Sequence, residues 1–182
     1  MQALSPASSL LQPPISLLEK TPTILETLLR DVPTEILDWK PAPDRWSVAE
    51  TLDIALAEDF IFQNVTDKIT KAPAGVSERD IAKADAMVLA MTPGRTRKFQ
   101  APPPLKPPGR WTPAETLDHF QRSRSHTIEY LEATPDLRQH VVDSPLGQPL
   151  DAYEWLLFIG AHGARHTKQI LEVKSDPNFP EG

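Results

Sequence analysis

Apolar residues recur at intervals of three and four in four long stretches of the chain. These stretches cover residues 16–31, 47–70, 113–133 and 151–174. Such spacing places the apolar side chains along one stripe of an α-helix, so the pattern predicts four amphipathic helices. No stretch alternates apolar and polar residues with a period of two, and we therefore expect no sheet.

Three of the four stretches begin with a capping box, in which a short polar residue is followed three positions later by Glu. The pairs are Ser47 with Glu50, Thr112 with Glu115, and Asp151 with Glu154. The first side chain accepts a hydrogen bond from the backbone of the third helical residue, and the Glu accepts one in return from the backbone of the capping residue. These helix starts are therefore predicted more sharply than the helix ends.

The segment between the second and third predicted helices is rich in proline. A short helix is predicted over 77–89, because Ile81, Ala84 and Val88 share one face. After it, prolines stand at positions 93, 102, 103, 104, 107 and 108. Proline breaks regular structure and favours an extended connection. The sequence thus predicts an all-α fold, a four-helix bundle with a long crossover between helices two and three, which then run parallel.

The length of the chain favours a single domain. It has 182 residues, 40% of them hydrophobic, which suffices for one sizeable core. We expect a flexible N-terminal arm over 1–14, a single four-helix-bundle domain over 15–175 and a C-terminal tail over 176–182. The N-terminus lacks the features of a signal peptide, and no apolar run is long enough to span a membrane. We therefore expect a cytoplasmic protein with no membrane partner.

Composition narrows the chemistry that is open to the chain. It contains no cysteine, so a metal ion would have to be held by His, Asp or Glu. The formal net charge of -6 argues against a nucleic-acid partner. One basic segment, Arg95–Arg110, is interpreted as a solvated surface loop. No serine or threonine stands in a recognisable nucleophile motif, so no catalytic residue is assigned.

His162 and His166 are the most informative polar pair in the sequence. Residues four apart project from one face of a helix, so the two imidazoles can reach one ion. They follow Trp155–Ala161, a nearly uncharged apolar stretch, which places them on the interior side. Gly160 and Gly163 weaken this helix and indicate a close approach by a neighbouring helix or a ligand. Two interpretations stay open: metal ligands, or histidines that are satisfied within the core or exposed.

Two segments resemble the DinB-like superfamily of small bacterial four-helix-bundle proteins. They are LDWKPAPDRWSVAETLDIALAED, residues 37–59, and AHGARHTKQI, residues 161–170. The order of helices and the crossover extend the resemblance from about residue 17 to residue 173. It implies a divalent metal ion, nickel or zinc, held by one histidine of the second helix and two of the fourth. His162 and His166 match the latter two, whereas Ile54 stands where the first is expected.

The replacement by Ile54 leaves the third ligand open. Glu58 lies one turn later on the same face and is the best substitute, with Asp53 and Asp59 as poorer ones. The predicted metal ligands are thus His162, His166 and Glu58. A protein that has lost the metal ion remains the alternative, because catalytic sites usually have three protein ligands.

Another candidate ligand comes from an internal similarity. RWSVAETLDIAL, residues 45–56, is similar to RWTPAETLDHFQ, residues 110–121, and His119 occupies the position that matches Ile54. Two short matches are also what two well-capped helix starts produce, so a duplication is not established. His126 and His140 are interpreted as solvated.

Three functions follow from these residues and from the resemblance. The first is a metal-binding protein, a metal-dependent transferase or hydrolase in which the ion lowers the pKa of a bound thiol or water. The second is a degenerate, metal-free module that binds a small molecule. The third is a protein whose bundle serves dimerisation, and the resemblance implies a homodimer. We further expect Trp39, Trp46 and Trp111 to cover the bundle end and Trp155 to pack inside it.

Overall fold

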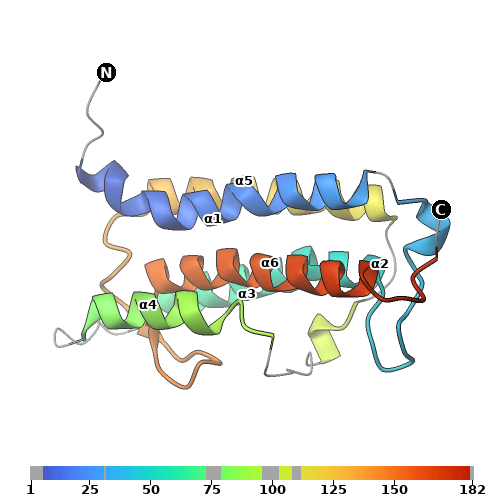
Figure 1. Ribbon diagram of the computed structural model, residues 1–182. Helices are drawn as coiled ribbons and strands as arrows, with labels where there is room; N and C mark the ends of the chain where they lie inside the picture. The colour runs from blue at the N-terminus through green and yellow to red at the C-terminus, as the bar shows by residue number, and fades with distance from the viewer. Residues whose placement is uncertain (1–5, 31, 73–78, 96–102, 108–111, 181–182) are drawn as a thin grey trace.

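The computed structural model describes residues 6–30, 32–72, 79–95, 103–107 and 112–180; the side chains of 6–12, 54–57 and 104 are not described. The helices are α1 (Pro6–Leu29), α2 (Val48–Leu52), α3 (Ile54–Ile69), α4 (Ile81–Met91), α5 (Pro113–Ala133) and α6 (Ala152–Lys174). Short 3-10 turns lie at Thr34–Ile36 and Pro103–Leu105. Long helices lie side by side in Figure 1, so the prediction of an all-α four-helix bundle is confirmed.

The second and third long helices run parallel, as a crossover requires. In Figure 1, α3 and α5 both run from the end of the bundle that carries α2 toward the opposite end. The chain returns between them through α4, which packs against α6. The predicted short helix therefore exists, but it begins at Ile81 instead of Ser77, with Asp80 as its cap. Ser77 itself lies outside the described residues.

The three predicted capping boxes are all present. Ser47 Oγ accepts from the Glu50 backbone at 3.0 Å, and Thr112 Oγ1 accepts from the Glu115 backbone at 3.3 Å. The Asp151 carboxylate accepts from the Glu154 backbone at 2.8 Å. In each box the Glu side chain returns a bond to the capping residue, so two helical N–H groups are satisfied by local sequence alone.

Helix α6 forms the centre of the bundle. Every residue from Ala152 to Ala161 is buried, and α6 packs against α1, α2, α3 and α4. A Cβ atom at Gly160 would lie 2.7 Å from Cβ of Leu17 in α1. The close helix approach that the glycines predicted is thus confirmed.

Among the described side chains, the buried apolar residues form two clusters separated along the bundle axis. One cluster surrounds Phe158 and Ile159 at the first half of α6, and the other surrounds Ile170 and Val173 near its end. On α5, Leu131 belongs to the first cluster and Phe120 to the second. The stretch of α6 between the clusters carries polar side chains, which sets a polar layer inside the bundle.

Part of the expected N-terminal arm is helical. Helix α1 begins at Pro6 and contains Pro13, Pro14 and Pro22, whereas a flexible arm was expected over 1–14. Pro13 and Pro14 were interpreted as signs of a loose arm. A proline removes one helical hydrogen bond, and a helix can continue through it where tertiary packing holds both sides. Pro14 is buried.

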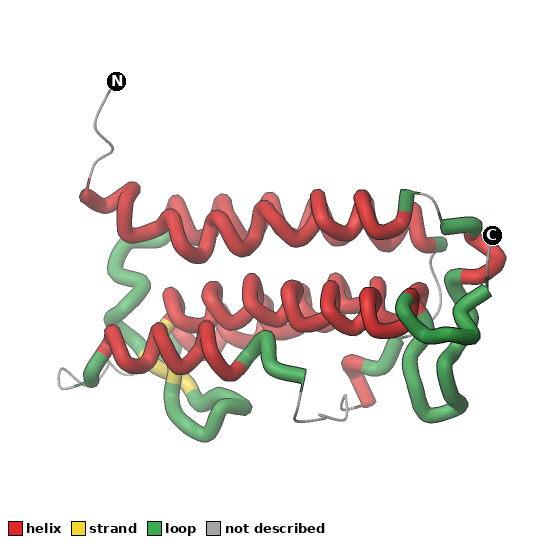
Figure 2. Tube along the Cα trace, in the orientation of Figure 1, coloured by secondary structure: helices red, strands yellow, loops and turns green. Residues whose placement is uncertain are grey.

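Two further expectations need correction. The predicted helix over 47–70 is divided at Asp53, whose ψ of 3° interrupts the helical ladder between α2 and α3. A small sheet also exists, because β1 (Val141–Val142) pairs antiparallel with β2 (Leu150–Asp151). Figure 2 shows this ribbon at the end of the bundle where α4 and α6 begin. Strands of two residues are too short to produce a period-two pattern.

Arginine pairs attach the ribbon and α4 to the start of α6. Arg138 contacts both carboxylate oxygens of Asp85 at 2.8 Å and Oδ2 of Asp151 at 3.2 Å. Arg79 contacts Asp151 at 3.4 Å and also pairs with Glu154. Asp151 and Glu154 are fully buried, and burial raises the pKa of Glu154 while Arg79 opposes that change. These ion pairs hold the ribbon and α4 against the start of α6.

Candidate functional site

His162 and His166 lie in the polar layer of α6, and their ring nitrogens converge. The two Nε2 atoms are 3.1 Å apart. The His162 side chain is 18% exposed and His166 is 8% exposed, so the pair lies at the edge of the interior. The interior placement that the sequence predicted is confirmed for both residues.

Glu58 approaches the same pair from α3. Its Oε1 lies 3.4 Å from Nδ1 of His162, on the opposite side of the imidazole ring from Nε2. Its Oε2 forms an ion pair with Nη2 of Arg124 on α5, at 2.6 Å. Glu58 is 1% exposed and Arg124 is 3% exposed. Side chains from α3, α5 and α6 therefore form one connected row of polar contacts inside the bundle.

Aromatic rings cover both imidazoles. Trp46 is stacked on His166 with ring centroids 6.1 Å apart and an interplanar angle of 13°. Phe158 is stacked on His162 at 5.9 Å and 20°. Trp46 was expected to cover the bundle end, and its more specific partner is the histidine. Trp39 does lie at the end of the bundle, edge-on to Phe179 at 5.5 Å.

His166 is held in the neutral form. Burial lowers its pKa well below the usual 6.5, and the nearby charges of Arg165 and Arg95 lower it further. Nδ1 of His166 is buried without a hydrogen bond of good geometry, although the Gln169 side chain interacts with the ring and acts to raise the pKa. A neutral imidazole has a free lone pair, which is the form that binds metal ions.

His119 lies with Asp59, the next residue after Glu58. Its Nε2 is 2.6 Å from Oδ2 of Asp59, and Ser123 donates to the other carboxylate oxygen. In the part of the chain that the structure describes, no group of three or more His, Asp or Glu side chains is arranged to hold one metal ion. His119 and Asp59 thus form a separate pair beside the His162–His166 layer.

The spacing of the two histidines suits one shared ion. Two imidazole nitrogens bound to a tetrahedral zinc ion at roughly 2.0–2.1 Å lie about 3.3 Å apart. The observed 3.1 Å is close to this value. Glu58 meets Nδ1 instead, and a carboxylate at the second nitrogen is the usual way in which a histidine ligand is oriented. The residues present therefore fit two ligands and one orienting carboxylate better than three ligands.

Other predicted residues lie away from the pair or outside the described part. Nothing is described of the Ile54 side chain or of Trp111. His126 is exposed, edge-on to Phe62 at 5.1 Å, in agreement with a solvated position. His140 is half-buried, and Trp155 packs in the core as expected. Asp53 is 6% exposed.

The basic segment is less free than the sequence indicated. Arg95 bonds to both carboxylate oxygens of Glu172, at 3.2 and 2.9 Å, and to the Gln169 amide at 3.1 Å. It is therefore attached to α6 instead of standing in a solvated loop. Lys106 is exposed, and the other basic residues of the segment lie outside the described part.

Arg124 is a buried polar residue that was not predicted, although the sequence carries a signal for it. Arg124 follows Phe120 by four residues and precedes Thr127 and Leu131 on the buried face of α5. A charged residue on an apolar stripe is rarely fully buried unless it is paired, so its position alone indicates a buried partner.

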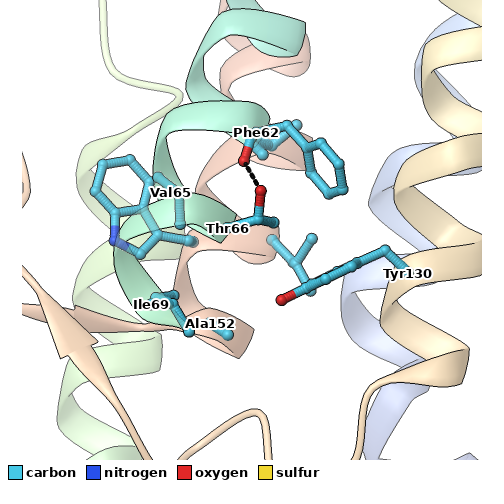
Figure 3. A pocket seen from close by; sticks show the side chains of 9 residues that line it. Phe62, Val65, Thr66, Ile69, Tyr130 and Ala152 are labelled. Atoms are coloured by element: carbon cyan, nitrogen blue, oxygen red, sulfur yellow. Dashed lines mark hydrogen bonds between the residues drawn. The ribbon is translucent and has the colours of Figure 1, made fainter. Parts of the chain in front are cut away.

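A separate small pocket lies in the first apolar cluster and offers little chemistry. Figure 3 shows its lining by Phe62, Val65, Thr66 and Ile69 of α3 together with Tyr130 and Ala152. The Thr66 hydroxyl donates to the Phe62 carbonyl at 2.9 Å and is thereby satisfied. We interpret this pocket as a packing gap between the described side chains.

Comparison with known proteins gives a family match and one relative. The family model described as the DinB superfamily matches residues 17–170. The uncharacterized protein YuaE of Bacillus subtilis is 27% identical over 151 residues, which cover 80% of this chain and 88% of YuaE. No solved structure matches the chain. Among the described residues, no helix has the length and apolar character needed to cross a membrane.

Proposed function

The chain belongs to the DinB superfamily, and from this premise we propose that it binds a divalent transition metal ion, nickel or zinc, through Nε2 of His162 and His166. The observation that carries the proposal is the convergence of two Nε2 atoms at 3.1 Å, with the pKa of His166 lowered by burial. Two imidazoles leave coordination positions for water or for a small-molecule ligand. When bound, the ion would lower the pKa of a coordinated thiol or water, the chemistry of a transferase or hydrolase.

Residues of this chain prepare the two ligands. Glu58 accepts from Nδ1 of His162 and fixes the plane of that ring, while Phe158 and Trp46 stack on the two imidazoles and shield them from water. Outer partners of this kind commonly change metal affinity by about 10–100-fold. As a direct third ligand Glu58 stays a prediction, and its contacts with Arg124 and Nδ1 favour the orienting role.

Metal analysis of protein purified without an affinity tag tests the proposal most directly. We expect uptake of nickel or zinc, and we expect His162→Ala and His166→Ala each to weaken binding in calorimetric titration by at least about tenfold. His126→Ala is the matched control, because His126 is an exposed histidine on α5. A protein that takes up neither ion, or whose affinity survives both substitutions, contradicts the proposal.

A metal-free small-molecule module is the second candidate. It is favoured by the position of Arg124, whose guanidinium already neutralises the only carboxylate that contacts the His162–His166 pair through a hydrogen bond among the described residues. Absence of metal uptake in the experiment above would support this candidate.

We also propose a cytoplasmic homodimer. Large apolar side chains are exposed on α4, at Ile81, Leu89 and Met91, and light scattering near 20.3 kDa would contradict the dimer.

A further inference from the structure

The ion pair between Arg124 and Glu58 is an unusual element of a bundle core. Both side chains are almost fully buried, and only Nη2 of Arg124 contacts the carboxylate. Nε and Nη1 of Arg124 and Oε2 of Glu58 are buried without a hydrogen bond of good geometry, whereas Nη2 donates to the Ile159 carbonyl at 3.5 Å. The guanidinium lies 4.6 Å from the centre of the Phe120 ring. A buried pair with unmatched donors contributes little to stability, since desolvation offsets the attraction.

Helix α6 is adapted to admit this guanidinium. A Cβ atom at position 163 would lie 2.7 Å from Nη2 of Arg124, so a larger residue there would force the guanidinium or the helix to shift. Glycine in a helix interior is itself unfavourable relative to alanine. Two unfavourable features therefore coincide at one contact. Their shared result is to place Nη2 of Arg124 at 2.6 Å from Oε2 of Glu58.

We propose that Arg124 is a positioning residue that sets the tautomer of His162. The positive guanidinium, which only donates hydrogen bonds, lies 2.6 Å from Oε2 and keeps an oxygen of residue 58 turned toward it, so the carboxylate of Glu58 acts as an acceptor toward His162. Nδ1 of His162 must then carry the proton and donate, which leaves a lone pair on Nε2. The order of donors and acceptors from Arg124 through Glu58 to His162 thus determines which nitrogen of His162 can bind an ion.

No other described contact of His162 defines this polarity. Phe158 stacks on the ring and offers no hydrogen bond. The contact between the two Nε2 atoms is compatible with donation in either direction, because each imidazole can carry its proton on either nitrogen. With Nδ1–H fixed on His162, the metal-free protein has His166 donating from Nε2 to Nε2 of His162. The inference concerns the metal-free protein, and only its relevance to metal binding rests on the proposed function.

Substitution of Glu58 by glutamine should reverse the direction of the hydrogen bond between residue 58 and Nδ1 of His162. An amide has one accepting and one donating end, and Arg124 requires the accepting end. The amide NH2 group then faces His162, so Nδ1 must accept and the proton moves to Nε2. In the double variant Glu58→Gln/Arg124→Met this requirement is gone, and the amide oxygen can turn toward His162 and restore Nδ1–H. If Arg124 only filled space, its replacement by Met would not restore the Nδ1–H tautomer of His162.

Nitrogen-15 NMR of histidine-labelled protein, treated with chelator and recorded at about pH 8.5, above the usual histidine pKa range, reads the tautomers directly. We expect His162 as Nδ1–H in the parent, mainly Nε2–H in Glu58→Gln, and a return toward Nδ1–H in the double variant. Arg122→Met, which removes an exposed arginine of the same helix, should leave the parent spectrum unchanged. Nε2–H in the parent, or no change in Glu58→Gln, overturns the inference.

Folding and metal binding are kept apart in this design. The parent spectrum alone decides against the inference if His162 is Nε2–H, even when Glu58→Gln does not fold. The double variant removes both buried charges together, which buried pairs usually tolerate. If metal binds, zinc affinity should fall about 10–100-fold in Glu58→Gln and recover in part in the double variant. A parent that binds no metal but shows the expected tautomers contradicts the proposed function and leaves the inference standing.

Discussion

Replacing Gly163 by alanine tests whether the crowded crossing between α6 and Arg124 is real. The added Cβ would lie 2.7 Å from Nη2 of Arg124 and 3.0 Å from both Cγ2 and Oγ1 of Thr21 on α1. Contacts below 3.0 Å force a neighbour to move. Nη2 is paired with Glu58, and the Thr21 hydroxyl donates to the Leu17 carbonyl at 3.2 Å, so both neighbours are held in place.

Two opposing effects decide the sign of the change in stability. Alanine is favoured over glycine in a helix interior by about 1 kcal/mol. Overpacking a dense core costs about 1–3 kcal/mol. Because three atoms of two restrained side chains must shift, we take the middle of that range and expect a net loss of about 1 kcal/mol. For a domain of this size this loss lowers the melting midpoint by about 2–4 °C.

Thermal and urea unfolding, followed by circular dichroism, measure this change. Ala164→Gly in the same turn is the control, since it reports the helix propensity difference at a half-buried neighbour. The loss of stability caused by Gly163→Ala should be smaller in an Arg124→Met background than in the parent, because the closest contact of the added methyl group is then removed. If Gly163→Ala instead stabilises the protein by the full propensity difference, Arg124 does not cross α6 at this point.

Three further predictions concern other parts of the bundle. Gly160→Ala should reduce the free energy of unfolding in the same assay, because its Cβ would lie 2.7 Å from Cβ of Leu17; a stabilised variant would contradict the close packing of α1 and α6. Ile54→His should tighten zinc binding in calorimetric titration by supplying a third imidazole, and unchanged affinity would show that this position does not reach the pair. Hydrogen bonding from Arg95 lowers the pKa of Glu172 below 4.5, so this contact stabilises the protein above about pH 4.5 and loses its effect as pH falls through the lowered pKa. Glu172→Gln should therefore lower stability at pH 7 by less than about 1 kcal/mol, and the difference should vanish in acid; a difference that persists there would count against the ion pair.

Features that depend on short stretches of sequence were predicted well. The capping boxes at Ser47, Thr112 and Asp151 all form, because each needs only residues within one helical turn. The buried stripe of α6 follows from helical periodicity, and its interior histidines follow from the same spacing. The proline-rich connection was sufficient to predict the crossover, since it is too long for a tight turn.

Errors arose where packing overrides local preference. Pro13 and Pro14 indicated a loose arm, yet α1 continues through them. The division at Asp53 and the two-residue strands of the ribbon also left no periodic signal. At the prolines, the free energy of tertiary packing exceeds the small preference of the local sequence.

The sequence by itself determined that His162 and His166 share the inner face of one helix, because four residues are about one turn. Only the tertiary structure decided what meets them. Glu58, Arg124 and Trp46 come from three other segments of the chain, and their contacts depend on how closely the helices cross at Gly163. Helical periodicity fixes the direction of a side chain from its own axis, whereas the partner across an interface depends on the depth and angle at which two helices pack.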